Sequence, residues 1–298
     1  MNSGDKFRTG TLAIVGRPNV GKSTLMNRLI GQKLSIVSRK PQTTRQRVTG
    51  ILTTGDCQYI FVDTPGFQTK HDSALNRVMN RNVTQALAAV DVIICVVDAG
   101  RIGAADRSIF KLLPHDRPVL LAINKIDRLS DKSALLPMME ALSKEYGFTD
   151  IVPVSAAHGE GTAALLAAAA MHLPVAPPQF EADDITDRSE RFLAAELLRE
   201  KLFRNLGEEL PYGIAVEIER FEQEGNLRRI FAAILVDKAA HKAMVIGRGG
   251  EKLKRMSTDA RLDMEKLFGG PVYLETWVKV STGWADSDRA LKSLGYDQ

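Results

Sequence analysis

The sequence predicts two domains, an α/β domain with a mostly parallel sheet followed by a smaller α+β domain. Strand-like and helical stretches alternate in the first half, whereas the second half has the order helix, two strands, two helices and a strand. A proline-rich and then acidic stretch separates the two halves. A chain of 298 residues is also long for one hydrophobic core, which favours two domains.

In the first domain we expect helices on both faces of the sheet, because strands and helices alternate along the chain. Strands are predicted at residues 11–15, 47–54, 58–62, 92–97, 119–123 and 151–154, and helices at 22–30, 75–89, 105–112, 133–146 and 162–172. The run at 92–97 is continuous and rich in β-branched residues, which is typical of a strand buried on both faces. The strands at 47–54 and 58–62 are predicted to be antiparallel, because their connection is too short for a crossover.

Residues 174–188 are predicted to link a domain at 1–173 to a domain at 189–298, because their prolines and acids cannot continue a helix. In the second domain we expect helices at 190–206, 238–246 and 251–268, and strands at 214–219, 227–236 and 272–280. A C-terminal tail follows, in which Trp284 is interpreted as a packing anchor rather than a stacking surface.

The composition argues against several classes of protein. Cys57 and Cys95 are the only cysteines and both lie in predicted strands, so we expect buried thiols and no disulfide framework. The five histidines show no ligand spacing, so no zinc site is predicted. The first ten residues are polar, and no apolar run approaches the roughly 18 residues that span a bilayer. We therefore predict no secretory signal, no transmembrane segment and a cytoplasmic location.

Residues 16–24 match the phosphate-binding pattern G-x-x-x-x-G-K-S-T. Its glycines allow consecutive backbone N–H groups to turn toward an anion at the start of a helix. Lys22 is expected to reach the outer phosphates, and the Ser23 hydroxyl to bind Mg²⁺. The alternative, a plain glycine turn, does not require Lys-Ser directly after Gly21. The predicted phosphate contacts are Gly16, Asn19, Val20, Gly21, Lys22, Ser23 and Thr24.

Two further segments complete a predicted site for Mg²⁺ and the γ-phosphate. Asp63-Thr64-Pro65-Gly66 follows a strand, where Asp63 would hold Mg²⁺ through water and the Gly66 amide would contact the γ-phosphate. Residues 38–47 are polar, basic and broken by a proline, which predicts a mobile loop whose Thr43 or Thr44 gives Mg²⁺ a second hydroxyl. Thr44 is taken as the ligand. Taken singly, the segments also fit a Pro-Gly turn and a solvated surface loop. The predicted metal ligands are Ser23, Thr44 and Asp63.

Residues 124–127, Asn-Lys-Ile-Asp, indicate guanine as the base. The Asp127 carboxylate can accept hydrogen bonds from the N1–H and the exocyclic amine of guanine, whereas adenine lacks both donors. Lys125 is expected to lay its aliphatic stem over the base, and Asn124 to brace the loop. Ser155-Ala156 would offer a backbone N–H to the guanine oxygen. GTP and GDP with Mg²⁺ are therefore the predicted ligands.

Residues 16–24, 42–45, 63–66, 124–127 and 155–156 together resemble the five signature segments of translation-factor-class P-loop GTPases, in the same order. Within that class, Gly-Arg-Pro-Asn-Val-Gly-Lys-Ser and Gln-Thr-Thr-Arg resemble the Era family, as does the tail with Gly-Trp-Ala-Asp and Leu-Gly-Tyr. The α-β-β-α-α-β order resembles a type II KH domain. The resemblance implies a GTPase that binds 16S rRNA near its 3′ end and assists maturation of the 30S ribosomal subunit.

The resemblance also bears on catalysis. Ras-like enzymes carry a water-orienting Gln directly after the glycine of the Asp-x-x-Gly segment, where this sequence has Phe67. Because Phe67 cannot orient water, slow intrinsic hydrolysis is implied. Related GTPases use an Asn matching Asn19 to help bind K⁺, which makes K⁺ an expected additional cation. The predicted catalytic residues are Asn19, Lys22, Thr44 and Gly66.

A glycine-rich loop between two predicted helices is the predicted RNA site. Such loops let a sugar-phosphate backbone approach closely and grip about four nucleotides of a single strand. From residue 238 to residue 255 there are six Lys or Arg and one acid, Glu251. A tight turn between helices is the alternative. The predicted RNA-binding residues are Gly247, Arg248, Gly249, Gly250, Lys252, Lys254 and Arg255.

Two other functions fit parts of the sequence. A signalling or membrane-surface GTPase would use the second domain to dock a protein or a lipid. Peripheral contact with the inner face of the cell membrane therefore stays open. A P-loop kinase or ATPase is opposed by residues 124–127 and by the lack of an evident lid over an acceptor substrate. We expect a monomer whose partners are the rRNA of the small subunit and the 30S particle.

Overall fold

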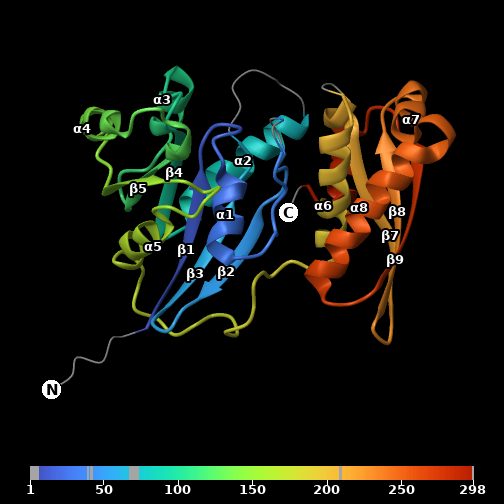
Figure 1. The fold of residues 1–298 in the computed structure, drawn as a ribbon, viewed down its shortest axis with the longest axis horizontal. Helices are drawn as coiled ribbons and strands as arrows, with labels where there is room; N and C mark the ends of the chain where they lie inside the picture. Colours follow the sequence, from blue (N-terminus) through green and yellow to red (C-terminus); the bar gives the residue numbers. More distant parts are fainter. Residues whose placement is uncertain (1–6, 39, 41–42, 67–73, 208–209, 297–298) are drawn as a thin grey trace. The chain divides into compact units, whose positions relative to one another are not determined.

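The structure is a computed structural model, and it describes residues 7–38, 40, 43–66, 74–207 and 210–296 (Figure 1). The chain forms two compact units. The first consists of Met1–Ser35, Thr44–Lys70 and Met79–Asp187, and the second of Ile36–Thr43, His71–Val78 and Arg188–Gln298. The sequence did not indicate that two short segments from the first half of the chain join the second unit.

The first unit contains a six-stranded sheet in the order β2-β3-β1-β4-β5-β6. Among the strands that the structure describes in this sheet, β2 alone runs antiparallel, paired with β3, and the other strand pairs are parallel. The predicted parallel sheet with one antiparallel strand is therefore confirmed. The strands are β1 (Arg8–Val15), β2 (Val48–Thr53), β3 (Cys57–Asp63), β4 (Val92–Asp98), β5 (Val119–Asn124) and β6 (Asp150–Val154).

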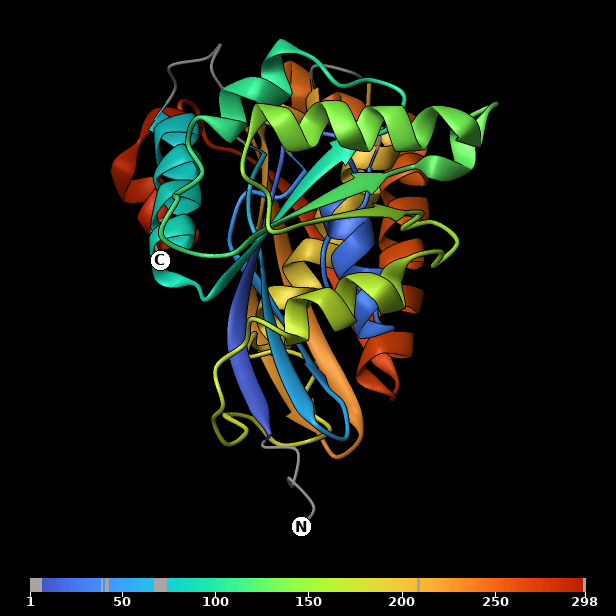
Figure 2. The ribbon, with the colours of Figure 1, turned by 90° about the vertical axis from the view of Figure 1, so that its left-hand side faces the viewer.

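Helices cover both faces of this sheet (Figure 2). The helices are α1 (Lys22–Ile30), α2 (Ala74–Ala89), α3 (Ala104–Phe110), α4 (Leu135–Glu145) and α5 (Thr162–Ala170). Helices α2, α3 and α4 share one core with alternate strand residues such as Ile93 and Leu121, while α1 and α5 pack against the sheet from the other side. Because β1, β3, β4, β5 and β6 are parallel, their carboxyl ends meet at one edge, where the predicted segments at 16–24, 63–66, 124–127 and 155–156 begin.

The predicted linker is ordered along the first unit rather than free of it. Gln58 of β3 accepts hydrogen bonds through Oε1 from the backbone N–H groups of Gln179 (2.7 Å) and Phe180 (3.0 Å). The Ile51 N–H of β2 donates to Ile185 O at 2.9 Å. The proline-rich stretch therefore fastens to β2 and β3 before the second unit begins.

The second unit has a three-stranded sheet in the order β7-β8-β9, in which β7 and β8 are antiparallel and β8 and β9 parallel. Ile230, Ile234 and Val278 of the sheet pack with Leu197, Val245 and Met256 of the helices in one core. The predicted α-β-β-α-α-β order is confirmed, although β7 runs five residues further than expected. The elements are α6 (Glu190–Asn205), β7 (Ile214–Glu224), β8 (Leu227–Val236), α7 (Ala239–Ile246), α8 (Glu251–Phe268) and β9 (Val272–Val280).

The tail ends in a short helix, α9 (Asp288–Ser293), and is anchored by Trp284. The Trp284 side chain is 1% exposed, its Nε1 donates to Gly213 O at 3.0 Å, and its ring stacks on Tyr296. The interpretation of Trp284 as a packing anchor is therefore confirmed.

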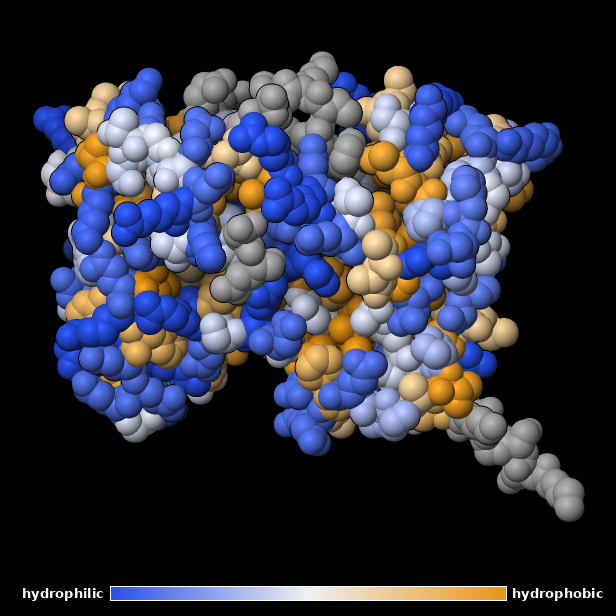
Figure 3. Space-filling model, turned by 180° about the vertical axis from the view of Figure 1, so that it is seen from behind, coloured by the Kyte–Doolittle hydropathy of each residue, from blue (hydrophilic) through white to orange (hydrophobic). Residues whose placement is uncertain are grey.

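The hydropathy of the surface and the burial of the two cysteines can be compared with the expectations from the composition. On the face shown in Figure 3, hydrophobic side chains lie in small groups between hydrophilic ones. Among the described helices, none combines the length and the apolar character that crossing a bilayer requires. Cys57 and Cys95 are free, buried thiols, as predicted.

Candidate nucleotide-binding and RNA-binding sites

The phosphate loop connects the carboxyl end of β1 to the first turn of α1. Gly21, just before α1, has φ +103°, and a Cβ atom there would lie 2.3 Å from Nδ2 of Asn124. Both the backbone conformation and the close approach therefore require glycine. The free N–H groups at the start of α1 make this point an anion-binding position.

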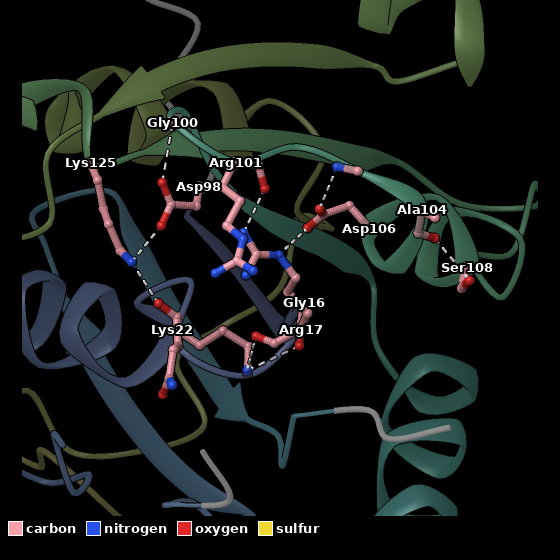
Figure 4. A network of polar contacts seen from close by, with 12 residues as sticks. Gly16, Arg17, Lys22, Asp98, Gly100, Arg101, Ala104, Asp106, Ser108 and Lys125 are labelled. Atoms are coloured by element: carbon pink, nitrogen blue, oxygen red, sulfur yellow. Dashed lines mark hydrogen bonds and ion pairs between the residues drawn. The ribbon is translucent and has the colours of Figure 1, made fainter. Parts of the chain in front are cut away.

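Side chains hold the carbonyl groups of the phosphate loop (Figure 4). Lys22 Nζ donates to Gly16 O at 3.0 Å and to Arg17 O at 3.1 Å. Lys125 Nζ donates to Asn19 O at 2.6 Å, and Asn124 Nδ2 donates to Val20 O at 2.8 Å. Because these carbonyl oxygens accept hydrogen bonds from side chains, the N–H groups of the same loop can face a phosphate. The loop is therefore preorganised for an anion.

Three oxygen-bearing side chains meet beside this loop. Ser23 Oγ donates to Asp63 Oδ2 at 2.7 Å and lies 3.0 Å from Thr44 Oγ1. Asp63 is fully buried, and its Oδ1 accepts no hydrogen bond from any residue that the structure describes. Hard oxygen donors with a buried carboxylate suit Mg²⁺, so the predicted ligand set fits this cation. Thr43 instead donates to Lys40 O at 2.8 Å, so the structure places Thr44 with the other two ligands.

Burial controls the ionisation of this cluster. Burial lowers the pKa of Lys22 to about 8, and the nearby Asp63 carboxylate opposes the shift only in part. Burial also raises the pKa of Asp63, while the Lys22 ammonium acts in the opposite direction. A cation and a phosphate bound here would favour the charged forms of Asp63 and Lys22 respectively, because each supplies the opposite charge.

The predicted base-reading residues lie together at the ends of β5 and β6. Asp127 Oδ1 accepts a hydrogen bond from Ser155 Oγ at 2.6 Å, and this bond holds the pKa of Asp127 below its usual value. Asn124 Oδ1 accepts from the N–H groups of Lys125 (2.8 Å) and Ala156 (3.0 Å), which joins the two loops. The carboxylate is therefore ionised at neutral pH and held in place.

The Asp63–Gly66 segment packs against the phosphate loop. A Cβ atom on Gly66 would lie 2.9 Å from Cγ of Pro18 and 3.0 Å from its N atom, so only glycine fits here. This packing places the Gly66 backbone beside Arg17 and Pro18, which form the front of the phosphate loop, as a γ-phosphate contact requires. Phe67, which stands at the position of the water-orienting Gln of Ras-like enzymes and was predicted not to orient water, lies outside the described residues.

The glycine-rich loop of the second unit joins α7 to α8. Gly249 and Gly250 have φ angles of +58° and +80°, conformations that side chains rarely adopt. Beside the loop, a cavity of about 350 Å³ lies between α8 and β9. Gly250 and Lys254, two of the predicted RNA contacts, line it together with Leu253, Ser257, Thr258, Arg261, Leu274, Glu275 and Thr276.

Sequence reasoning missed Arg17, Asp98 and Asp106, and it named Ser155 only for a backbone N–H and not for its hydroxyl. The Ser155 hydroxyl bonds Asp127, Asp98 pairs with Lys125, and Arg17 pairs with Asp106. Arg17 occupies a position that the phosphate-loop motif leaves unspecified. Asp98 and Asp106 lie outside all the motifs, and nothing in the sequence pairs them with Lys125 and Arg17.

Fold and site together define a phosphate-loop GTPase that carries a KH domain. In agreement, the family of 50S ribosome-binding GTPases matches residues 11–125, and the KH domain family matches residues 209–285.

The whole chain is similar to bacterial proteins of one family. It is 58% identical to GTPase Era of Nitrosomonas eutropha, over 99% of this chain and 100% of that protein. It is 56% identical to GTPase Era of Chromobacterium violaceum, over 98% of each. The chain therefore belongs to the Era family of GTPases.

Solved structures of this family show the same fold. A crystal structure of Era in complex with MgGDPNP and nucleotides 1506–1542 of 16S ribosomal RNA superposes with a TM-score of 0.94, at 38% identity, over 98% of this chain and all of that one. A variant of Aquifex aeolicus Era bound to GDP·AlF4⁻ gives the same TM-score, identity and coverage.

Proposed function

We propose that this chain is a GTP-dependent switch that binds 16S rRNA near its 3′ end through its KH domain and assists maturation of the 30S subunit. The observation that carries the proposal is the presence, in one chain, of a braced phosphate loop with a guanine-type carboxylate and of a glycine-rich KH loop beside a cavity. The 16S rRNA bound in the related Era structure supports the small subunit as the target.

The first unit would bind and hydrolyse GTP. Ser23, Thr44 and Asp63 would hold Mg²⁺, which when bound neutralises charge on the phosphate oxygens. Lys22 would stabilise the negative charge of the outer phosphates, and the Gly66 amide would contact the γ-phosphate. Asn19 would help to hold a K⁺ ion, which is the proposed source of further charge stabilisation. Asp127 would select guanine with its two oxygen atoms.

The second unit would bind single-stranded RNA along the glycine-rich loop. Arg248, Lys252, Lys254 and Arg255 supply positive charge for the phosphates, and the cavity between α8 and β9 is lined by hydroxyl, charged and apolar groups that suit bases. Arg248 and Lys254 are exposed, so their side chains are accessible to RNA. Arg255 is also exposed, but its Nη2 donates to Asn205 Oδ1 of α6 at 2.6 Å, a bond that contact with RNA would have to replace or share.

The segment with Thr43 and Thr44 would couple the state of the nucleotide to the RNA-binding domain. Thr44 belongs to the first unit, where its hydroxyl lies 3.0 Å from Ser23 Oγ, and the preceding Thr43 belongs to the second. Within the second unit, Arg199 Nη2 of α6 donates to Thr43 O at 2.6 Å. A shift of Thr44 when the γ-phosphate leaves would therefore be passed along the backbone to α6.

The test is the RNA affinity of Gly249→Asp, with Gly249→Asn as a matched control. A Cβ atom on Gly249 meets nothing within 4 Å, and Asn and Asp both tolerate a positive φ, so both variants should fold. Only Asp adds a negative charge beside the phosphates. We expect Gly249→Asp to weaken binding of nucleotides 1506–1542 of 16S rRNA by about tenfold or more, and Gly249→Asn to weaken it much less.

The same experiment separates the proposal from its alternative. A signalling or membrane-surface GTPase, with a second domain that docks a protein or a lipid, predicts unchanged RNA affinity in both variants. Equal affinities for the original chain and Gly249→Asp would therefore reject the RNA function. We further propose that the chain acts in the cytoplasm as a monomer, with any membrane contact peripheral, which sedimentation and cell fractionation would test.

A further inference from the structure

Arg17 lies inside the phosphate loop, but its side chain is directed away from the loop (Figure 4). Its Nε donates to Asp106 Oδ1 at 2.9 Å, and its Nη2 donates to Arg101 O at 2.6 Å. The guanidinium fork therefore spans two acceptors in the connection from β4 to α3 and in the first turn of α3. No atom of this connection belongs to a recognised nucleotide-binding segment.

The acceptor on α3 is a buried carboxylate with both oxygens engaged. Asp106 is 2% exposed, and its Oδ2 accepts a second hydrogen bond from the Gly103 N–H at 3.0 Å. A buried carboxylate bonded to a guanidinium is held in a narrow range of geometries, because leaving the charge without its partner is strongly unfavourable. Arg17 is therefore fastened to a rigid point.

The main chain of Arg17 carries this restraint into the site. Its carbonyl accepts a hydrogen bond from Lys22 Nζ at 3.1 Å. The next residue, Pro18, packs against Gly66, the predicted γ-phosphate contact. Arg17 thus anchors the front of the loop. Asn124 and Lys125 anchor its back, which consists of Asn19 and Val20.

We propose that Arg17 and Asp106 are positioning residues for the γ-phosphate. The pair holds the front of the phosphate loop where Lys22 and Gly66 must meet the terminal phosphate, so it sets the preference for GTP over GDP. The inference rests on the proposed binding of GTP. It assigns to the connection between β4 and α3 a part in reading the nucleotide state.

Asp98, the last residue of β4, allows a comparison at the back of the loop. Lys125 Nζ lies between Asp98 Oδ2 and Asn19 O, at 2.6 Å from each, and Asp98 Oδ1 also accepts from the Gly100 N–H at 3.1 Å. Asp98 therefore supports the base side of the site, which GTP and GDP share. Loss of Asp98 should weaken both nucleotides equally.

The experiment measures the affinities of the full chain for GDP and for a non-hydrolysable GTP analogue with Mg²⁺ by calorimetry. Asp106→Asn leaves one acceptor oxygen for two donors, and Arg17→Ala removes the fork. We expect both variants to lower the ratio of GTP to GDP affinity by about tenfold or more, because this is what one lost hydrogen bond to the charged γ-phosphate is worth. Asp98→Asn should weaken both nucleotides with an unchanged ratio.

Two further variants complete the set. Arg107→Ala, on the same helix as Asp106, breaks the exposed pair with Glu145 of α4 and should leave both affinities unchanged. Arg17→Lys keeps the charge but reaches only one acceptor, so it should recover part of the ratio. An unchanged ratio in folded Asp106→Asn and Arg17→Lys would overturn the inference, even if Arg17→Ala failed to fold. An original chain that binds neither nucleotide would instead overturn the proposed function.

Discussion

Replacing Asp127 by Asn tests the base-reading carboxylate directly. The substitution keeps the size of the side chain but exchanges one acceptor oxygen for an N–H₂ donor. Guanine presents two donors to this position, whereas xanthine presents one donor and one acceptor oxygen. Ser155 Oγ lies 2.6 Å from Asp127 Oδ1, so in the variant it is expected to hold the amide oxygen and to turn the N–H₂ group toward the exocyclic position of the base.

The magnitude follows from the hydrogen bonds at stake. A hydrogen bond to a charged group contributes about 1.5–3 kcal/mol, so two such bonds to guanine correspond to about 10²- to 10⁴-fold in affinity. Part of the charge of Asp127 is already engaged by Ser155. We therefore expect the lower half of that range, a loss of about 10²- to 10³-fold for GTP, and tighter binding of XTP than of GTP.

Calorimetric titration with GTP and with XTP measures both effects. Asp131→Asn is the matched control, because Asp131 is an exposed carboxylate four residues away that only caps a short helix through Ser133. The control should bind GTP as the original chain does. Equal GTP affinity in Asp127→Asn and the original chain would refute the assigned role of this carboxylate.

Three other predictions concern Lys22 and Asn19 of the phosphate loop and Gly161 at the start of α5. Because burial lowers the pKa of Lys22 from 10.5 to about 8, the buried ammonium costs about 3 kcal/mol of stability below pH 8, so Lys22→Met should unfold at higher denaturant than the original chain at pH 7. Asn19→Ala should abolish any stimulation of GTP hydrolysis by K⁺ relative to Na⁺, measured by phosphate release. Gly161→Ala should lower the free energy of unfolding by about 3 kcal/mol or more, because φ is +75° and the new Cβ would lie 2.1 Å from Pro153 O.

Each of these predictions has a decisive counter-result. Between pH 8 and pH 10.5 the folded chain loses the Lys22 proton before the unfolded chain does, so stability rises with pH and the advantage of Lys22→Met should shrink; a constant advantage contradicts the buried-charge argument. K⁺ stimulation that survives Asn19→Ala removes the proposed ion site. Gly31 has φ +77° and open space around its Cβ position, so Gly31→Ala should cost only about 1–2 kcal/mol, and an equal cost at Gly161 would contradict the clash.

The ligand classes and much of the fold can be predicted from the sequence, because they depend on residue types within short segments. The Gly-Lys-Ser triplet, the carboxylate of Asp127 and the glycines at 247–250 each need a particular residue type, so the ligand classes follow from short stretches of sequence. The sheet follows from strand–helix alternation and one short connection. The choice between Thr43 and Thr44 as the Mg²⁺ ligand cannot be made from the sequence. The two residues are identical and adjacent, and they differ only in where the folded chain directs their side chains.

Contacts between distant segments were decided by the tertiary structure alone. Arg17 meets Asp106 across 89 positions, and Ser155 meets Asp127 across 28. Parallel strands bring their carboxyl ends to one edge, and an ion pair made there leaves no periodicity or spacing in the sequence. The residues expected to touch the nucleotide could therefore be named from the sequence, whereas the ion pairs that hold the loops in place emerge only from the fold.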